Sequence, residues 1–325
     1  MRAKSIEKKP PADDRASKSS IFAFSGHETF VFRYGWMKKA VDAISEKADA
    51  LSSGDAMVTL GVGKNMVRSV RHWALATQIL DETAGTRGSS LSCTPLGAML
   101  LGPQGFDPYL EDINSLWLLH WKLVTSERRS TTWSWAFNLL TDNEFTRDSL
   151  ASLIREELQR RGAKLPSDNS LERDIDCFIR TYAAPRDKKA SVLEDTLDCP
   201  LVELQLVEED VAPGLFYFKR GEQKTLADEV FLYALLDFWD RTASQRETFA
   251  FAEIAYGFGS PGSVFKLDEN TIAERLERVD RISKGSLSYA ETAGLRQVYR
   301  HRSVDRFTAL KSLYGRVEIA VSGGA

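Results

Sequence analysis

Apolar residues recur at helical spacing over most of this chain. In the segment Tyr34–Ala50 they would line one face of an amphipathic helix, as Trp36, Ala40, Val41 and Ile44. The next segment, Ala56–Leu80, predicts two short helices joined by the turn Gly61–Gly63, where a glycine can supply the positive φ of a tight turn. The turn is not a phosphate-binding loop, because it lacks the required glycine spacing and the Lys-Ser/Thr ending.

The second of these helices has two different faces. Apolar residues at helical spacing would face a core: Met66, Val67, Val70, Trp73 and Ala74. The other face carries basic and amide residues: Lys64, Asn65, Arg68, Arg71 and His72. Such a helix suits a DNA groove, because Arg and Lys bind phosphates or guanine edges and Asn can hydrogen-bond adenine. The alternative is that these side chains only solvate an ordinary surface helix.

A hairpin is predicted directly after the basic helix. The segment Leu80–Cys93 has a glycine-rich centre between short strand-like ends, and Thr94–Leu100 opens another short helix. Helix, helix, basic helix and hairpin in this order are typical of a winged-helix domain, which we place at residues 21–105. Residues 1–20 are rich in Lys, Pro, Asp and Ser and predict a disordered tail.

A helical middle domain is predicted for residues 106–200. It contains the aromatic segment Leu116–Leu123, the amphipathic helices Arg147–Arg161 and Ser170–Tyr182, and the charged linker Ala184–Asp195. Three charged residues of the last of these helices are expected on a solvated face: Arg173, Asp174 and Asp176.

The C-terminal domain, residues 201–325, repeats the order of the first. An apolar helix is predicted at Thr225–Asp240, an amphipathic one at Asp268–Ile282 and a hairpin within Leu287–Arg300. The amphipathic helix would turn three arginines outward: Arg275, Arg278 and Arg281. We therefore predict a second winged-helix unit here, and a fold that is mainly α (α+β) overall.

Charge and composition limit where nucleic acid could bind. The 325 residues carry a formal net charge of only -3, so DNA contact would be confined to local basic patches. Cys93, Cys177 and Cys199 are widely spaced and form neither a disulfide framework nor a metal knuckle. No segment approaches the ~20 apolar residues of a membrane span, and the N-terminus is not a secretory signal. A cytoplasmic protein that does not enter the membrane is expected.

Two clusters of polar residues are candidates for catalysis. In the segment Ser25–Thr29, His27 and Glu28 could bind a metal or act as acid and base. The alternative is a helix cap, in which Ser25 or Thr29 bonds backbone donors.

The second cluster contains Asp107, Glu111 and Asp112, followed by His120. If Asp107 begins a helix, its carboxylate and that of Glu111 share one face and could hold Mg²⁺ for phosphodiester cleavage, with His120 as a further catalytic candidate. The competing interpretation makes Asp107 a helix cap, Glu111 and Asp112 first-turn acids, and His120 a packed core residue.

Five long blocks of sequence resemble one family of bacterial defence proteins. They are FSGHETFVFRYGWMKKA, LGVGKNMVRSVRHWALAT, DPYLEDINSLWLLHW, GSPGSVFKLDEN and ETAGLRQVYR. In these blocks, from about Phe22 to Arg300, the chain is similar to the SspB-type DNA-nicking family of single-strand phosphorothioate-modification systems. The resemblance implies a cytoplasmic protein that binds double-stranded DNA and nicks one strand with a divalent cation such as Mg²⁺.

The resemblance also implies partners. These are a PAPS-reductase-like sulfur-transfer protein, an ATPase and a cysteine desulfurase, which together replace a phosphate oxygen by sulfur. Two alternatives to a nickase stay open at this point. One is a non-catalytic winged-helix adaptor that recruits the sulfur-transfer partners to DNA, and the other is a transcriptional regulator.

Overall fold

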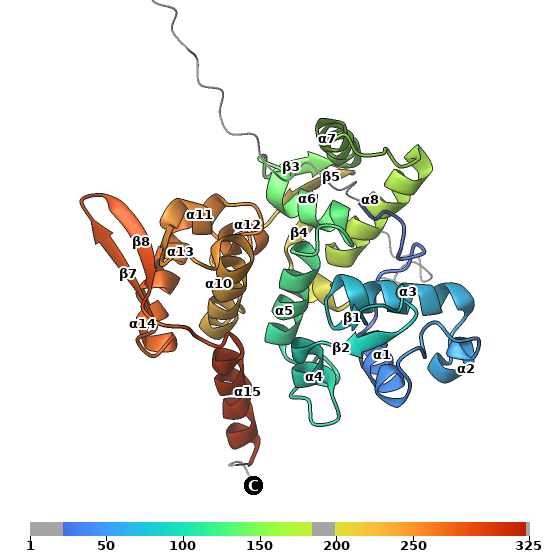
Figure 1. Cartoon of the computed structure of the whole chain (residues 1–325). Helices are drawn as coiled ribbons and strands as arrows, with labels where there is room; N and C mark the ends of the chain where they lie inside the picture. Colours follow the sequence, from blue (N-terminus) through green and yellow to red (C-terminus); the bar gives the residue numbers. More distant parts are fainter. Residues whose placement is uncertain (1–21, 184–198, 323–325) are drawn as a thin grey trace, which may run out of the picture.

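The computed structural model describes residues 22–183 and 199–322 (Figure 1). Helices predominate, and three small antiparallel sheets lie among them. The expected fold class, mainly α with some β structure, is confirmed at this level. The predicted tail, residues 1–20, and the predicted linker, Ala184–Asp195, lie outside the described residues.

The first part of the described chain follows the predicted order of helices and hairpin. Its elements are α1 (Tyr34–Glu46), α2 (Ala56–Leu60), α3 (Lys64–Ala76), β1 (Leu80–Glu82), β2 (Leu91–Cys93) and α4 (Pro95–Leu101). The two strands are antiparallel, with Leu80 opposite Cys93. Helix α4 begins where Thr94 accepts a hydrogen bond from the backbone N–H of Gly97, which satisfies one free donor of the first turn.

The middle of the chain is helical but includes a sheet that was not predicted. Its elements are α5 (Ile113–Val124), α6 (Thr131–Leu139), β3 (Glu144–Thr146), α7 (Arg147–Arg160), α8 (Asp168–Tyr182), the 3₁₀ helix η1 (Pro200–Leu204), β4 (Val207–Glu209) and β5 (Leu215–Phe218). In the sheet, β5 lies between β3 and β4, and Phe145 is opposite Phe216. The sheet therefore joins segments from both sides of the domain boundary predicted at residue 200.

The last part of the chain again contains helices followed by a hairpin. Its elements are α10 (Asp228–Ala243), β6 (Thr248–Ala250), α11 (Phe251–Tyr256), α12 (Pro261–Val264), α13 (Glu269–Glu277), α14 (Val279–Ile282), β7 (Leu287–Thr292), β8 (Leu295–Arg300) and α15 (Phe307–Ser322). The hairpin strand β8 lies between β6 and β7. The segment Asp268–Ile282, predicted as one amphipathic helix, forms two consecutive helices, α13 and α14.

One of the three arginines expected on the surface of this region is buried. Arg275 is only 6% exposed, and its Nη1 donates to Asp228 Oδ1 at 2.7 Å. Arg278 reaches the same carboxylate, with Nε 2.6 Å from Oδ2. The prediction that Arg275 faces solvent is wrong, because a carboxylate on α10 compensates its charge inside the protein.

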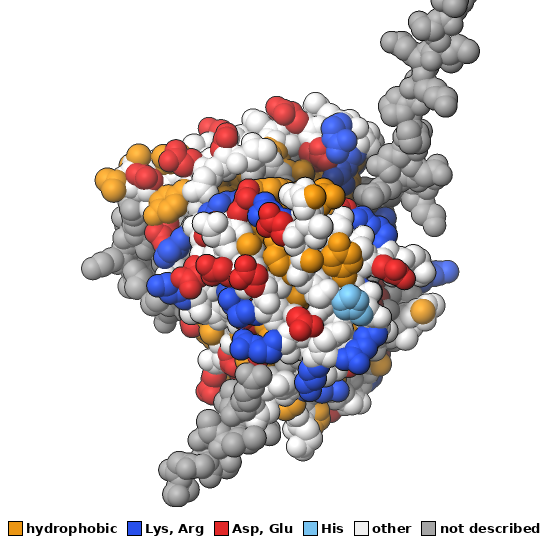
Figure 2. Space-filling model, turned by 90° about the vertical axis from the view of Figure 1, so that its left-hand side faces the viewer, with side chains coloured by type: hydrophobic (Ala, Val, Ile, Leu, Met, Phe, Trp, Pro, Cys, Tyr) orange, Lys and Arg blue, Asp and Glu red, His pale blue; other side chains and the backbone are white. Residues whose placement is uncertain are grey.

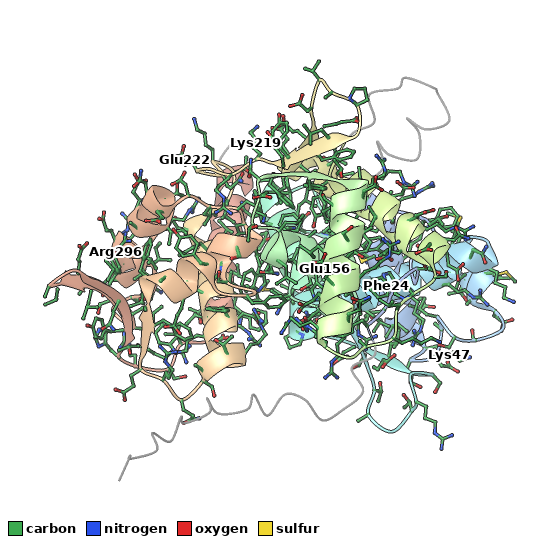
Figure 3. The ribbon with its side chains drawn as sticks, turned by 90° about the horizontal axis from the view of Figure 1, so that it is seen from above. Phe24, Lys47, Glu156, Lys219, Glu222 and Arg296 are labelled. Atoms are coloured by element: carbon green, nitrogen blue, oxygen red, sulfur yellow. The ribbon has the colours of Figure 1, made fainter. Side chains whose placement is uncertain are left out.

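The buried hydrophobic side chains of all three parts form one continuous cluster. All seven tryptophans of the chain are buried. Seen from above, Arg296 and Lys47 lie toward opposite ends of the molecule, with Glu156 of α7 between them (Figure 3). Within the described residues, no helix combines the length and the apolar character needed to cross a membrane.

A buried charged network joins α5, α10 and the segment before α15. The carboxylate of Asp237 accepts hydrogen bonds from Lys122 Nζ at 2.8 Å and from Trp121 Nε1 at 2.9 Å. Arg241 and Arg306 contact the same carboxylate at 3.0 and 2.9 Å. Because buried charges are stable only when they are paired and hydrogen-bonded, these contacts fix how the three segments pack.

We expect Asp237→Ala to lower the free energy of unfolding by about 3–5 kcal/mol, because it leaves the ammonium group of Lys122 buried without its counter-ion. The control is Asp42→Ala, which removes an exposed pair with Lys38 and should cost at most about 1 kcal/mol. Urea unfolding of both variants measures the difference. Equal losses would show that the buried network does not hold these segments together.

Candidate nucleic-acid interface

Helix α3 is packed as its sequence pattern predicts. Val67, Val70, Trp73 and Ala74 are buried against the core, and Met66 packs against it at the edge. On the outer side Lys64, Asn65 and Arg68 are exposed, whereas Arg71 and His72 are half-buried. The turn before the helix uses Gly61 at φ +65°, and its N–H closes α2 by bonding the carbonyl groups of Met57 and Val58. The helix thus presents the N-terminal part of its basic face to solvent.

Arg71 attaches the hairpin to α3. Its Nη2 donates to the carbonyl oxygen of Gly88 at 2.7 Å and lies 3.3 Å from Glu82 Oε1. Arg129, from the turn between α5 and α6, contacts the other oxygen of Glu82 at 3.2 Å. Partial burial alone would raise the pKa of Glu82, but the two guanidinium groups lower it below its usual value. Arg71 is therefore engaged within the protein and holds the β1–β2 hairpin in place.

The loop Ser25–Thr29 crosses α3 and is anchored by a carboxylate on α8. His27 is fully buried, and its Nε2 lies 2.8 Å from Asp174 Oδ1. The same oxygen accepts the backbone N–H of Ser25 at 2.7 Å, and Thr132 donates to Asp174 Oδ2 at 2.5 Å. The backbone N–H of Thr29 donates to His27 Nδ1 at 3.0 Å. Both ring nitrogens of His27 are thus occupied in this arrangement.

The expectation that Asp174 faces solvent is wrong. Asp174 is only 1% exposed. It lies on the apolar side of α8, with Leu171 three residues before it and Phe178 four residues after it. This helical spacing was the signal in the sequence that Asp174 is buried. The hydrogen-bond partners of Asp174 could not be predicted, because His27 and Thr132 are far from it along the chain.

Backbone geometry in the loop Ser25–Thr29 is unusual. Ser25, Glu28 and Thr29 have φ values of +63°, +50° and +69°, which non-glycine residues rarely adopt. A Cβ atom on Gly26 would lie 2.4 Å from Nδ1 of His72. Glycine is therefore required at this position for the loop to lie directly on α3.

His72 is covered by this loop and does not face outward. Although the residue as a whole is half-buried, its Nε2 atom is inaccessible and has no hydrogen-bond partner among the described residues. Burial, together with the neighbouring His27, lowers the pKa of His72 to about 3. The ring is uncharged at neutral pH, so it would not attract a DNA phosphate while the loop stays in place.

Glu28 is the one predicted catalytic residue that reaches the surface of this region. Its Oε1 lies 3.3 Å from Nη1 of Arg68, and both side chains are partly exposed. An exposed pair of this kind is weak, so a phosphate can replace Glu28 as the partner of Arg68.

His120 lies in the core, away from this surface. It is fully buried, with Nδ1 2.7 Å from the hydroxyl of Tyr182 and Nε2 2.9 Å from the carbonyl oxygen of Val264. Burial lowers the pKa of His120 to about 3. The structure does not bring His120 together with His27 or Glu28, and it matches the alternative in which this residue is a packed member of the core.

Asp107 does not begin a helix, so the predicted stacking of two carboxylates on one helical face is wrong. Its two oxygens accept the backbone N–H groups of Glu111 at 2.8 Å and Asp112 at 3.1 Å, which closes a turn. Pro108 disfavours helical geometry at the residue before it. The helix α5 begins only at Ile113, capped by Asp112, while Glu111 is exposed.

The described residues do not form a ready-made metal centre. Nowhere among them do three His, Cys, Asp or Glu side chains come together in a group that could hold a metal ion. The proposed ligands Asp107, Glu111 and Asp112 lie in one turn, but two of the three carboxylates already bond backbone N–H groups.

The family described as a protein of unknown function (DUF4007) matches residues 24–314 of the chain. The chain belongs to this family. It is also similar to a magnesium ion-bound SspB crystal structure, with 31% identity, a TM-score of 0.83, and coverage of 94% of this chain and 91% of that chain. A second SspB crystal structure has 32% identity and a TM-score of 0.80, covering 91% and 88% of the two chains. No curated protein matches the chain.

These similarities extend over nearly the whole chain, and the protein is SspB-like, as the five sequence blocks indicated. In this chain the sequence FSGHET lies at the loop over α3, and LGVGKNMVRSVRHW covers the turn before α3 and most of α3 itself. Two of the five blocks are therefore in direct contact.

The lowered pKa values of His72 and His120 predict a specific dependence of stability on pH. His72 and His120 stay neutral in the folded protein because their pKa values are lowered to about 3, but in the unfolded chain each takes up a proton near pH 6.5. The stability they contribute is present above pH 6.5 and is lost as the pH falls below it. The free energy of unfolding should therefore fall by about 1.4 kcal/mol per pH unit for each histidine between pH 6 and 5.

Urea unfolding between pH 8 and 5 measures this dependence. His72→Asn removes one of the two groups and should reduce the slope by about half, whatever it does to the stability at pH 8. A free energy of unfolding that is unchanged between pH 7 and 5 would contradict the neutral, buried state of both rings.

Proposed function

We propose that this protein binds double-stranded DNA through a winged-helix unit, with α3 as the recognition helix and the β1–β2 hairpin as the wing. The observation that carries the proposal is the exposed group Lys64, Asn65 and Arg68 on α3, beside a hairpin that Arg71 holds against the same helix. Asn can hydrogen-bond adenine in the major groove, and Lys and Arg bind guanine edges or phosphates.

The charges beside α3 support this surface. Lys64, Arg87 of the hairpin and Arg128 of the α5–α6 turn are exposed and have no carboxylate partner among the described residues. Arg129 is fixed to the hairpin through Glu82, which brings the α5–α6 turn next to it. Since the whole chain has a net charge of -3, such a local excess of cations is what could attract a polyanion.

We further propose that the protein acts in a DNA phosphorothioation system in the cytoplasm. Similarity to SspB over more than nine-tenths of the chain supports this assignment. The proposed partners are the sulfur-transfer protein of the PAPS-reductase type, the ATPase and the cysteine desulfurase that the family resemblance implies. Association of the purified chain with a candidate partner, measured with and without duplex DNA, tests each of them.

Replacing the exposed residues of α3 should weaken DNA binding. We expect Lys64→Ala with Arg68→Ala to lower affinity for a short duplex and to reduce the slope of log K against log salt by about 1.8, that is about 0.9 for each lost phosphate contact. Fluorescence anisotropy at four salt concentrations measures both quantities.

Lys164→Ala is the matched control for this experiment, since Lys164 is also an exposed cation without a carboxylate partner among the described residues but lies in the loop between α7 and α8. It should leave both quantities unchanged. If Lys164→Ala, which removes one charge, had about half the effect of the α3 variant, which removes two, net charge rather than the face of α3 would govern DNA binding. An intact slope in the α3 variant would remove the proposed interface.

Magnesium-dependent nicking of one DNA strand is the second candidate function. Similarity to the magnesium ion-bound SspB structure favours it. Of the predicted acidic residues, Glu111 is exposed, Glu28 and Asp112 are partly exposed, and Asp107 is buried. The described side chains alone do not fit a metal centre of three or more ligands.

Incubation with supercoiled plasmid tests this second function. A nickase should convert the plasmid to open circles with Mg²⁺ and not with a chelator, and Glu111→Gln or Glu28→Gln should reduce the rate at least 10-fold if that carboxylate acts in the reaction. Lys164→Ala again serves as the control. DNA binding without open circles under any divalent cation would instead favour the non-catalytic adaptor.

A further inference from the structure

Cations in the C-terminal part of the chain fall into two groups. Most of its arginines form ion pairs: Arg241, Arg246, Arg275, Arg278, Arg296, Arg300 and Arg306. Four exposed cations between residues 225 and 315 have no carboxylate partner in the part of the chain that the structure describes: Arg281, Lys284, Arg302 and Lys311. Figure 2, which looks at this side of the molecule, shows Lys and Arg side chains predominating on its lower part.

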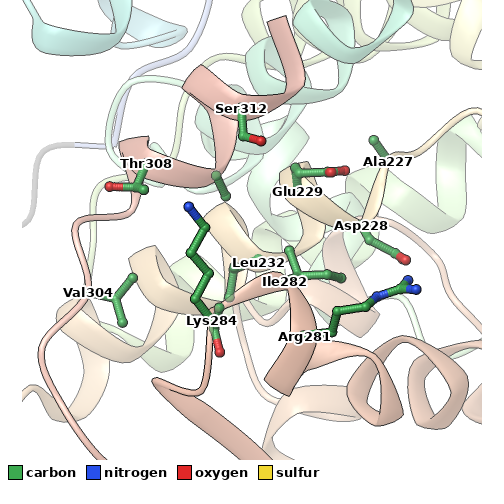
Figure 4. A pocket seen from close by; sticks show the side chains of 12 residues that line it. Ala227, Asp228, Glu229, Leu232, Arg281, Ile282, Lys284, Val304, Thr308 and Ser312 are labelled. Carbon is green, nitrogen blue, oxygen red and sulfur yellow. The ribbon is translucent and has the colours of Figure 1, made fainter. Parts of the chain in front are cut away.

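Two of these unpaired cations line one cleft, and the other two are close to its lining residues in the chain or in space. Arg281 and Lys284 line a cavity of about 540 Å³ between the first turns of α10 and α15 and the turn after α14 (Figure 4). Arg302 donates from Nη2 to the carbonyl oxygen of Lys284 and from Nε to Ser286 Oγ at 2.9 Å. Lys311 follows the lining residue Thr308 by one turn of α15.

Two carboxylates also line the cleft, but neither neutralises these cations. Asp228 is paired with Arg275 at 2.7 Å and with Arg278 at 2.6 Å. Glu229 also has an interaction of its own. The charges of Arg281 on α14 and of Lys284 in the turn after it are therefore available to an anion.

The outer face of α13 does not suit an anion. Helix α13 and the short α14 together precede the C-terminal hairpin, as α3 precedes the β1–β2 hairpin. The exposed side chains of α13 are Glu269, Asn270, Glu274 and Glu277, because its arginines turn inward to Asp228. Like charges repel, so a DNA phosphate would avoid α13 and approach the unit from the side of the cleft.

We propose that this cleft binds a phosphate group, with Lys284 and Arg281 as its main cations and Arg302 and Lys311 at its rim. Its volume of about 540 Å³ lies within the roughly 300–1,000 Å³ of small-molecule sites, so the phosphate could belong to a free nucleotide. A backbone phosphate of bound DNA offers the same chemistry. If the phosphate belongs to DNA, the proposal rests on the proposed function. If it belongs to a free nucleotide, the proposal is independent of that function.

The test compares Arg281→Ala with Lys284→Ala, made together, with the control Lys164→Ala in the full chain. All three side chains are exposed, so the variants should fold, which circular dichroism verifies. The probes are AMP, ATP and inorganic phosphate by calorimetry, and a short duplex at several salt concentrations. We expect the double variant either to lose at least 10-fold in nucleotide affinity or to reduce the salt slope of DNA binding by about 1.8.

The pattern of results identifies the source of the phosphate. Loss of AMP or ATP binding alone assigns a free nucleotide, and a reduced slope for DNA alone assigns the duplex backbone. If the α3 variant leaves DNA binding intact while the cleft variant reduces it, the proposed interface on α3 fails but the cleft stands. If no probe distinguishes the double variant from Lys164→Ala, or if the unaltered protein binds none of the probes, the cleft is not a phosphate site.

Discussion

The carboxylate of Asp174 joins three segments that are far apart in the sequence. It accepts hydrogen bonds from the ring of His27 and the backbone of Ser25 in the first described loop, and from Thr132 on α6, while its own helix is α8. Removing a charged group from water is costly unless every lone pair finds a donor, and here these donors come from segments that must meet for the carboxylate to be buried. The position of the loop on α3, and hence the shape of the candidate DNA surface, depends on this contact.

The cations of the protein are of two kinds, those paired with a carboxylate and those without a carboxylate partner. Where arginine meets a carboxylate inside the protein, as at Asp228 and Asp237, it contributes to packing. Where Lys or Arg is left without a carboxylate partner, as at Lys64 on α3 and Lys284 beside the cleft, the charge is available to a ligand. In a chain with a net charge of -3, this partition matters more than the total number of basic residues.

Local signals made part of the structure predictable. Helix α3, the glycine turn before it and the β1–β2 hairpin follow from residue spacing, because each depends on neighbours in sequence. The family resemblance was likewise visible in the sequence, because it rests on long uninterrupted blocks. The helical spacing of Asp174 with Leu171 and Phe178 was a signal of its burial that could have been used.

The candidate site was less predictable, because its chemistry depends on distant partners. Nothing near His120 in sequence indicates Tyr182 or Val264, which occupy its ring nitrogens, and the covering of His72 depends on a loop more than forty residues earlier. The role of Asp107 was likewise not predicted from the sequence. Its carboxylate accepts hydrogen bonds from backbone N–H groups and does not face outward.

The pairing of β3 with β5 has a consequence for how the chain folds during synthesis. The strand at Glu144–Thr146 has no partner until Leu215–Phe218 has left the ribosome, so the middle sheet can be completed only late in synthesis. The loop Ser25–Thr29 behaves like the sheet and not like the helices beside it, because its anchor lies on α8. The loop over α3 therefore leaves the ribosome before α3 does, but it can be anchored there only after α8 has been made.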